Sequence, residues 1–146
     1  MSGRPTSPPL GLQLARTARA VSQEFDRAMA TAGGSAATWQ VLLLVRSGEW
    51  STQSQLAKAM GITGATLTHH LKGLEAQGLV RRWREPDNAR VQRVELTPDG
   101  IAMFERLREV ARRHDERLRR ALTADQADQL RALLDRLDAG LHAAGD

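Results

Sequence analysis

Apolar residues recur at intervals of three and four along the first part of this 146-residue chain, from Leu10 to about Ala32. Such intervals are typical of one face of an α-helix. The positions that form this face are Leu14, Ala18, Val21, Phe25 and Ala28. Gly33 and Gly34 end the pattern, and residues 36–47 are apolar around most of a helical circumference. We therefore expect an amphipathic helix followed by a buried, central one.

Signals for two short helices joined by a tight turn come next. Thr52 and Gln55 have the spacing of a capping box, and Gly61 is placed to end that helix in a left-handed conformation. Thr63 is an N-cap for a second helix that we expect to reach about Gln77. The inward face of this second helix carries Leu67, Leu71 and Leu74. Its outward face carries Ala65, His69, Lys72 and Ala76, flanked by Thr66, Thr68 and Gly73.

A β-hairpin is predicted after these helices. Residues 79–84 and 91–96 are short alternating runs with β-branched residues, which favour strands. The connecting sequence EPDNAR contains Pro, Asp and Asn and predicts a turn. Val94 and Leu96 fall on one side of the second strand, which we take to face the core.

Two long helices complete the pattern. Thr97, Pro98 and Asp99 suit the N-cap, the first helical position and the positive end of the helix dipole. The apolar positions of this helix are Ile101, Phe104, Leu107, Val110 and Ala111. Thr123 and Gln126 form another capping-box spacing, before a helix with heptad-like apolar residues. Those residues are Ala127, Leu130, Leu134, Leu137 and Leu141. The expected fold is mainly α with a small β-hairpin wing, a winged helix-turn-helix in the order α-α-α-α-β-β-α-α.

The first helix and the last two have apolar faces that a small winged-helix core cannot cover. A second copy of the chain would cover them, so we expect a homodimer formed through residues 10–32 and 101–146. The alternative is an antiparallel bundle within one chain. We interpret residues 10–146 as a single domain with a winged helix-turn-helix lobe at 36–100, and the proline-rich residues 1–9 as a flexible arm.

Charge is placed unevenly along the chain, whose net charge is +4. Between Thr63 and Arg93 there are six basic residues against three acidic ones. From Thr97 onward, nine arginines stand against ten acids. A basic excess confined to the helix-turn-helix and the hairpin fits a surface that faces phosphates. The alternative is that arginine is simply abundant in this sequence.

A winged helix-turn-helix places its second helix in the DNA major groove, so this helix and the hairpin hold the candidate contacts. Donors on His69 and Lys72 can reach base edges or phosphates, whereas Arg90 at the hairpin tip suits the narrow minor groove. The candidate DNA-binding residues are Thr63, Ala65, Thr66, Thr68, His69, Lys72, Arg82, Arg84, Asn88 and Arg90. Alternatively, Thr66 and Thr68 are ordinary solvent-facing residues, and part of the hairpin arginines pair with Glu85, Asp87 or Glu95.

The segments QSQLAKAMGITGATLTHHLKGLEAQGLVRR and ARVQRVELTPDG, followed by two helices, resemble the multiple-antibiotic-resistance-regulator (MarR) family of bacterial transcription factors. The resemblance covers residues 10–144. It implies a homodimer, triangular in outline, whose terminal helices interlock while two winged lobes straddle a pseudo-palindromic operator. It also implies repression of a nearby gene, released by a small, often aromatic and anionic ligand.

One position departs from the family pattern. The wing of this family typically carries an aspartate two residues before an arginine, and the matching pair here is Asn88 and Arg90. An amide can still form hydrogen bonds but has no charge. Arg90 is therefore either held by the adjacent Asp87 or held less rigidly.

The resemblance also suggests an effector pocket between the dimerisation helices and the winged lobe. Arg16 and Arg19 are candidates for a clamp on a carboxylate, and Trp39 for a stacking wall. The alternative is that the arginines are solvated or paired with acids, and that Trp39 belongs to the core.

Catalytic and cofactor motifs are absent from the sequence. It has no P-loop, no dinucleotide-binding fingerprint and no G-x-S-x-G, so we predict no enzyme. Cysteine is absent and the histidines (His69, His70, His114 and His142) include no i,i+4 pair, so we predict no metal and no cofactor. No long apolar run or secretory signal is present, which predicts a cytoplasmic protein. The alternative function is a sequence-nonspecific, architectural DNA-binding protein.

Overall fold

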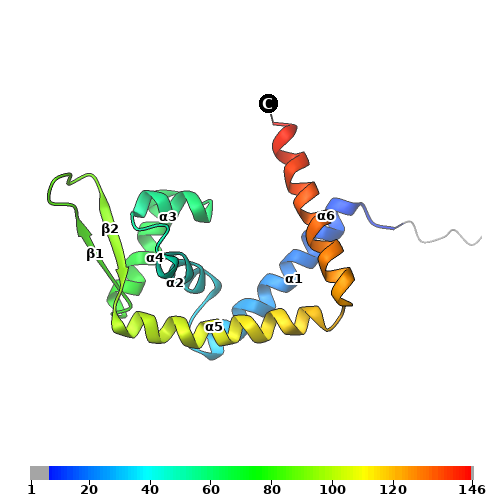
Figure 1. Cartoon of the computed structure of the whole chain (residues 1–146), viewed down its shortest axis with the longest axis horizontal. Helices are drawn as coiled ribbons and strands as arrows, with labels where there is room; N and C mark the ends of the chain where they lie inside the picture. Colours follow the sequence, from blue (N-terminus) through cyan, green and yellow to red (C-terminus); the bar gives the residue numbers. More distant parts are fainter. Residues whose placement is uncertain (1–6, 146) are drawn as a thin grey trace, which may run out of the picture. The chain divides into compact units, whose positions relative to one another are not determined.

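The structure is a computed structural model that describes residues 7–145, so residues 1–6 of the predicted arm lie outside the described residues. Helices and strands follow one another in the predicted order, α-α-α-α-β-β-α-α (Figure 1). The elements are α1 (Leu10–Thr31), α2 (Ala36–Ser47), α3 (Gln53–Met60), α4 (Gly64–Ala76), β1 (Val80–Arg84), β2 (Gln92–Leu96), α5 (Pro98–Arg119) and α6 (Ala124–Ala143). The predicted fold class, mainly α with a hairpin wing, is confirmed.

Local hydrogen bonds set the ends of these elements. Both halves of the Thr52–Gln55 capping box are present: the Gln55 N–H donates to Thr52 Oγ1 at 3.2 Å, and the Thr52 N–H to Gln55 Oε1 at 3.3 Å. Gly61 and Gly78 have φ values of 66° and 72°, in the left-handed region that glycine adopts without strain. The Leu79 N–H donates to the Leu74 carbonyl, so Leu79 belongs to the turn after α4 and not to β1 as expected.

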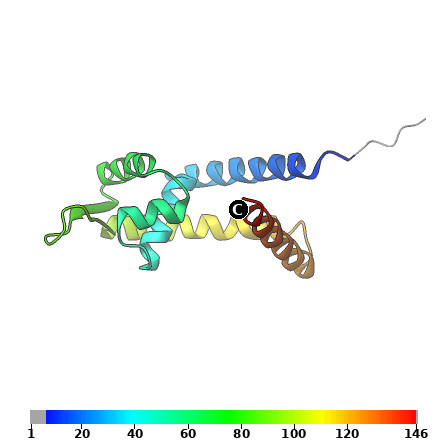
Figure 2. The ribbon, with the colours of Figure 1, turned by 90° about the horizontal axis from the view of Figure 1, so that it is seen from above.

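The chain divides into two compact units, residues up to Ala111 and residues from Arg112 onward, and each is described by itself. In the first unit, α2 supplies the centre of the core through Val41 and Leu42, which are fully buried. Strand β1 pairs with β2 in antiparallel register, with Val80 opposite Leu96, and Val94 is buried as predicted. Figures 1 and 2 both show the tip of this hairpin extending beyond α3 and α4.

The first half of α5 also belongs to the core of the first unit. Met103, Phe104 and Leu107 are buried, whereas Ile101 is 42% exposed. Met103, Phe104 and Leu107 lie within about 100° of one another on the helix, and Ile101 lies outside that arc. The segment 101–111, expected among the dimerisation helices, therefore supports the lobe as well.

The second unit consists of the end of α5 and α6. The Thr123–Gln126 capping box predicted for α6 is present. No residue of α6 is buried within this unit. A cavity of about 230 Å³ between the two helices is lined by apolar residues and a few charged ones, namely Asp115, Leu118, Arg119, Leu122, Ala127, Leu130, Arg131 and Leu134. Arg119 donates a hydrogen bond to the Asp115 carboxylate at 2.7 Å, which raises the pKa of its guanidinium.

Within the described part of the chain, no single helix is long and apolar enough to cross a membrane. Helices α1 and α2 reach the necessary length and composition only when counted together across a bend of 79°.

Candidate nucleic-acid interface

Helix α4 presents a polar face to solvent. Leu67, Leu71 and Leu74 anchor its inner side in the core. The residues expected on its outer side are exposed, namely Ala65, Thr66, His69 and Lys72. Thr63 caps the helix by accepting the Thr66 N–H at 3.1 Å. The helix is thus rigidly seated while its outer side chains remain accessible to a ligand as large as a DNA duplex.

A concave surface lies between α4, the start of α3 and the hairpin, and encloses about 780 Å³. We refer to it as the wing groove. It is lined by Thr52, Gln53, Ser54, Ala57, Gly64, Thr68, Lys72, Arg82, Arg84, Arg90, Val91 and Gln92. Four of these residues are cationic and none is acidic. A concave surface that carries cationic side chains and no acidic ones concentrates positive potential, which attracts a polyanion.

The hairpin arginines divide into paired and unpaired groups. Arg81 pairs with Glu95 across the strands, and Arg93 pairs with Glu85 and also donates to Ser51 Oγ at 2.7 Å. The alternative that part of these arginines pair with nearby acids is thus confirmed for these two. Arg84 has no acidic partner within residues 7–145, and its Nη1 donates to the Ala89 carbonyl at 2.7 Å.

The wing tip is shaped by backbone hydrogen bonds. Asn88 Oδ1 accepts the backbone N–H of Arg90 at 3.2 Å, and the Val91 N–H donates to the Asn88 carbonyl at 2.9 Å. Asn88 therefore fixes the backbone of the turn and leaves the Arg90 guanidinium unrestrained. Among the described residues, Asp87 forms no ion pair with Arg90, so the first of the two arrangements expected from the sequence is not seen.

Two of the candidate DNA-binding residues are engaged inside the protein. Thr68 is half-buried, and its hydroxyl accepts a hydrogen bond from Gln53 Nε2 at 2.6 Å. The Arg82 side chain is only 13% exposed, and its Nη2 lies 3.0 Å from Glu75 Oε1. Sequence reasoning missed Gln53, Ser54 and Gln92, which also line the wing groove. The sequence places Gln53 directly after the N-cap Thr52, but no neighbouring residue indicates that its side chain bonds to Thr68 and Arg82.

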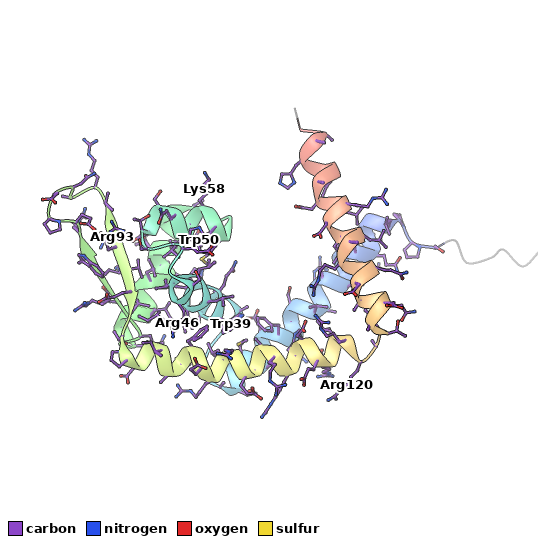
Figure 3. All side chains as sticks on the ribbon, in the orientation of Figure 1. Trp39, Arg46, Trp50, Lys58, Arg93 and Arg120 are labelled. Atoms are coloured by element: carbon purple, nitrogen blue, oxygen red, sulfur yellow. The ribbon has the colours of Figure 1, made fainter. Side chains whose placement is uncertain are left out.

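The structure does not bring the three ligand candidates together. Trp39 lies between α2 and α5, stacked on Phe104 with a centroid distance of 5.4 Å and an interplanar angle of 8° (Figure 3). Arg16 and Arg19 are exposed on α1 and make no cation–π contact with Trp39 in the described chain. Trp39 thus has the packing role of the alternative interpretation, and an effector pocket stays a prediction.

Residues 7–145 contain no group of three or more His, Cys, Asp or Glu side chains that could hold a metal ion. The rings of His69 and His70 lie 6.1 Å apart and are tilted by 58°.

Known proteins resemble the chain in both sequence and structure. The MarR family model matches residues 35–91, from the start of α2 to the end of the wing tip. The HTH-type transcriptional regulator YdgJ of Bacillus subtilis (strain 168) is 32% identical over 84% of this chain and 71% of its own length. The HTH-type transcriptional repressor IacR of Pseudomonas putida is 26% identical over 84% of this chain and 73% of its own.

Solved structures show the same fold in complexes with DNA. The transcriptional repressor CouR, bound to a 23-mer DNA duplex, has a TM-score of 0.83 and 30% identity, covering 89% of this chain and 92% of its own. A mutant of MarR from E. coli, complexed with operator DNA, has a TM-score of 0.76 and 28% identity, covering 86% of this chain and 93% of its own. The winged helix-turn-helix, the basic wing groove and these relatives together show the family. The chain belongs to the MarR family of DNA-binding transcriptional regulators, which are not enzymes.

Proposed function

We propose that this protein is a sequence-specific repressor that binds a pseudo-palindromic operator as a homodimer, and that it acts in the bacterial cytoplasm. The observation that carries the proposal is the wing groove, in which Lys72, Arg84 and Arg90 border the exposed face of α4 without an acidic side chain among them. Specific regulators combine phosphate contacts with contacts to base edges, and this surface offers donors for both.

In this proposal α4 enters the major groove and the wing tip follows the adjacent minor groove. His69 and Lys72 lie on the exposed face of α4 and supply donors for base edges or phosphates. Near the N-terminus of α4, Thr63, Ala65 and Thr66 contact the rim of the DNA major groove, where backbone N–H groups of the helix favour phosphate. Arg84, Asn88 and Arg90 form the contacts of the wing.

The proposed dimer is supported by apolar surface that the single chain leaves exposed. Thirteen large hydrophobic side chains of the described residues are more than a third exposed, and ten of them lie on α1, at the end of α5 or on α6 and its preceding turn. These are Leu10, Leu12, Leu14, Leu118, Leu122, Leu130, Leu133, Leu134, Leu137 and Leu141. Monomeric proteins rarely expose so many leucines in few elements, and a symmetric partner would cover them.

Replacing Arg90 with alanine is expected to weaken operator binding by about 1–3 kcal/mol, because its guanidinium is exposed at the wing tip and suits the negative potential of the minor groove. Fluorescence anisotropy with an operator duplex measures the change.

Arg81→Ala is the matched control, since Arg81 lies on the same hairpin but pairs with Glu95 and does not line the wing groove. We expect it to change affinity by less than about 0.5 kcal/mol. Equal losses in the two variants would show that the hairpin contributes only general positive charge.

Transcription from the promoter beside the operator tests repression directly. A purified template should yield fewer transcripts as the protein is added, whereas more transcripts would identify an activator. We further propose that a small aromatic acid is the effector, and that Arg16 and Arg19, both exposed on α1, bind its carboxylate. Such acids should restore transcription, and Arg16→Ala should weaken their effect. A panel that leaves transcription unchanged would remove the effector from the proposal.

A further inference from the structure

We propose that Gln53 is a positioning residue that fixes the rotation of α4 against the wing, and thereby determines how well the operator is distinguished from other DNA. This inference rests on the proposed DNA-binding function. It also places Thr68 and Arg82 in an internal network, outside the set of residues that contact DNA.

A chain of hydrogen bonds crosses from α4 to the wing through the Gln53 amide. Gln53 Nε2 donates to Thr68 Oγ1 on α4 at 2.6 Å, and Gln53 Oε1 accepts from Arg82 Nη1 on β1 at 3.4 Å. The same guanidinium donates through Nη2 to Glu75 Oε1 on α4 at 3.0 Å. One side chain of α3 and one of β1 thus hold α4 at two points.

Those two points lie on the same face of α4. Thr68 and Glu75 are seven residues apart, which is two turns of helix or about 10 Å along its axis. Lys72 lies between them on the same side and borders the wing groove. Because both attachments are on one face, they oppose rotation of α4 about its axis, the motion that would displace His69 and Lys72 from base edges.

The start of α3 is itself fastened to the wing. The Val94 N–H donates to the Ser51 carbonyl at 3.0 Å, and Arg93 Nη1 donates to Ser51 Oγ. Thr52 forms an isolated antiparallel bridge with Arg93. Gln53 therefore extends from a backbone that is already anchored to β2, and its amide can transmit the position of the wing to α4.

Arg82 is suited to this internal role and poorly suited to a phosphate contact. Its side chain is 13% exposed, and Glu75 supplies the opposite charge. A guanidinium already neutralised by a carboxylate displaces few of the cations condensed on the DNA phosphates, so Arg82 should add little to the salt dependence of affinity.

The expected consequence is a loss of selectivity without a loss of general attraction. Contacts to base edges need donors within narrow limits of distance and angle, whereas contacts to phosphate tolerate small displacements. Loosening α4 should therefore lower affinity for the operator much more than affinity for unrelated DNA.

The test compares Gln53→Met with the wild type by fluorescence anisotropy, using the operator duplex and a scrambled duplex of equal length over a series of salt concentrations. Methionine keeps the length of the side chain and removes the amide. We expect operator affinity to fall about tenfold and affinity for the scrambled duplex to fall less than about twofold, with an unchanged salt slope. Gln77→Met, at the exposed end of α4 and away from the wing groove, is the matched control and should resemble the wild type.

Thr68→Val separates positioning from direct contact. If Gln53 acts through Thr68, the double variant Gln53→Met/Thr68→Val should bind the operator no more weakly than Gln53→Met alone. Additive losses would overturn the proposal, because they would mean that both residues touch DNA separately. An unchanged operator affinity in Gln53→Met would also overturn the proposal, as would equal losses of affinity for the operator and the scrambled duplex.

The same variants are compared without DNA by thermal unfolding, which separates this inference from the proposed function. A hydrogen-bonded pair should give a double variant whose Tm falls by less than the sum of the two single shifts. If the wild type does not prefer its operator, the proposed function is refuted, together with the selectivity that rests on it. Non-additive Tm shifts in the variants would even then support the hydrogen-bond network of Gln53, Thr68 and Arg82. Additive Tm shifts would overturn the network itself.

Discussion

Replacing Gly100 with alanine should destabilise the winged lobe by at least about 3 kcal/mol, which lowers the Tm by roughly 10 °C. Gly100 is buried in the first turn of α5, and a Cβ atom there would lie 1.9 Å from the carbonyl oxygen of Leu79. That carbonyl accepts the Thr97 N–H at 3.1 Å, and the Thr97 hydroxyl donates to the Gly78 carbonyl at 2.5 Å. The obstacle is therefore backbone that is tied to the start of α5 and cannot move aside without breaking these bonds.

Thermal unfolding followed by circular dichroism measures this effect, with Gly73→Ala as the matched control. Gly73 is also helical, but its added Cβ would have no atom within 4 Å. Alanine should stabilise α4 there by about 0.5–1 kcal/mol, since it restricts the unfolded chain and favours helix. A Gly100→Ala variant as stable as the wild type would show that α5 packs less closely against the turn after α4.

Replacing Leu134 with glutamate is expected to convert the protein to monomers and to weaken operator binding by about a hundredfold or more. Leu134 is 41% exposed on α6, among leucines that we propose to be covered by the second chain. A charge buried without a partner in such an interface costs several kcal/mol. A monomer contacts only one half-site and loses the benefit of binding two sites at once.

Light scattering with size-exclusion chromatography gives the mass directly. The wild type should have a mass of about 32 kDa, twice the 16.0 kDa of one chain, and the variant a mass near that of one chain. Ala132→Glu is the control, because residue 132 lies about 160° around the helix from Leu134. If Leu134→Glu remained dimeric, the interface would have to lie on other elements.

Short-range signals in the sequence predicted most of the fold. The capping box of Thr52 and Gln55 joins residues three positions apart, so its residues alone reveal it. The left-handed conformation of Gly61 was likewise expected from its place after an apolar helical run. The assignment of Leu79 to the first strand was wrong, because its place at the start of an alternating run does not reveal its hydrogen bond to the Leu74 carbonyl.

The interior of the wing groove could not be predicted in the same way. Gln53 meets Thr68 and Arg82 across sequence separations of 15 and 29 residues, so no local pattern indicates these pairs. The pairing of Arg81 with Glu95 depends on the register of the hairpin, which places them opposite each other. Composition showed that the segment is basic, but only the folded chain shows which of its cations are already neutralised.

Above all, we propose that the wing groove and the exposed face of α4 distinguish one DNA sequence from others. Fluorescence anisotropy of the purified protein, titrated onto the duplex upstream of its own gene and onto a scrambled duplex of equal length at physiological salt, tests it most directly. We expect the upstream duplex to bind about a thousandfold more tightly, at the lower end for specific regulators. Equal affinity for the two duplexes would refute sequence-specific binding and favour an architectural, sequence-nonspecific DNA-binding protein.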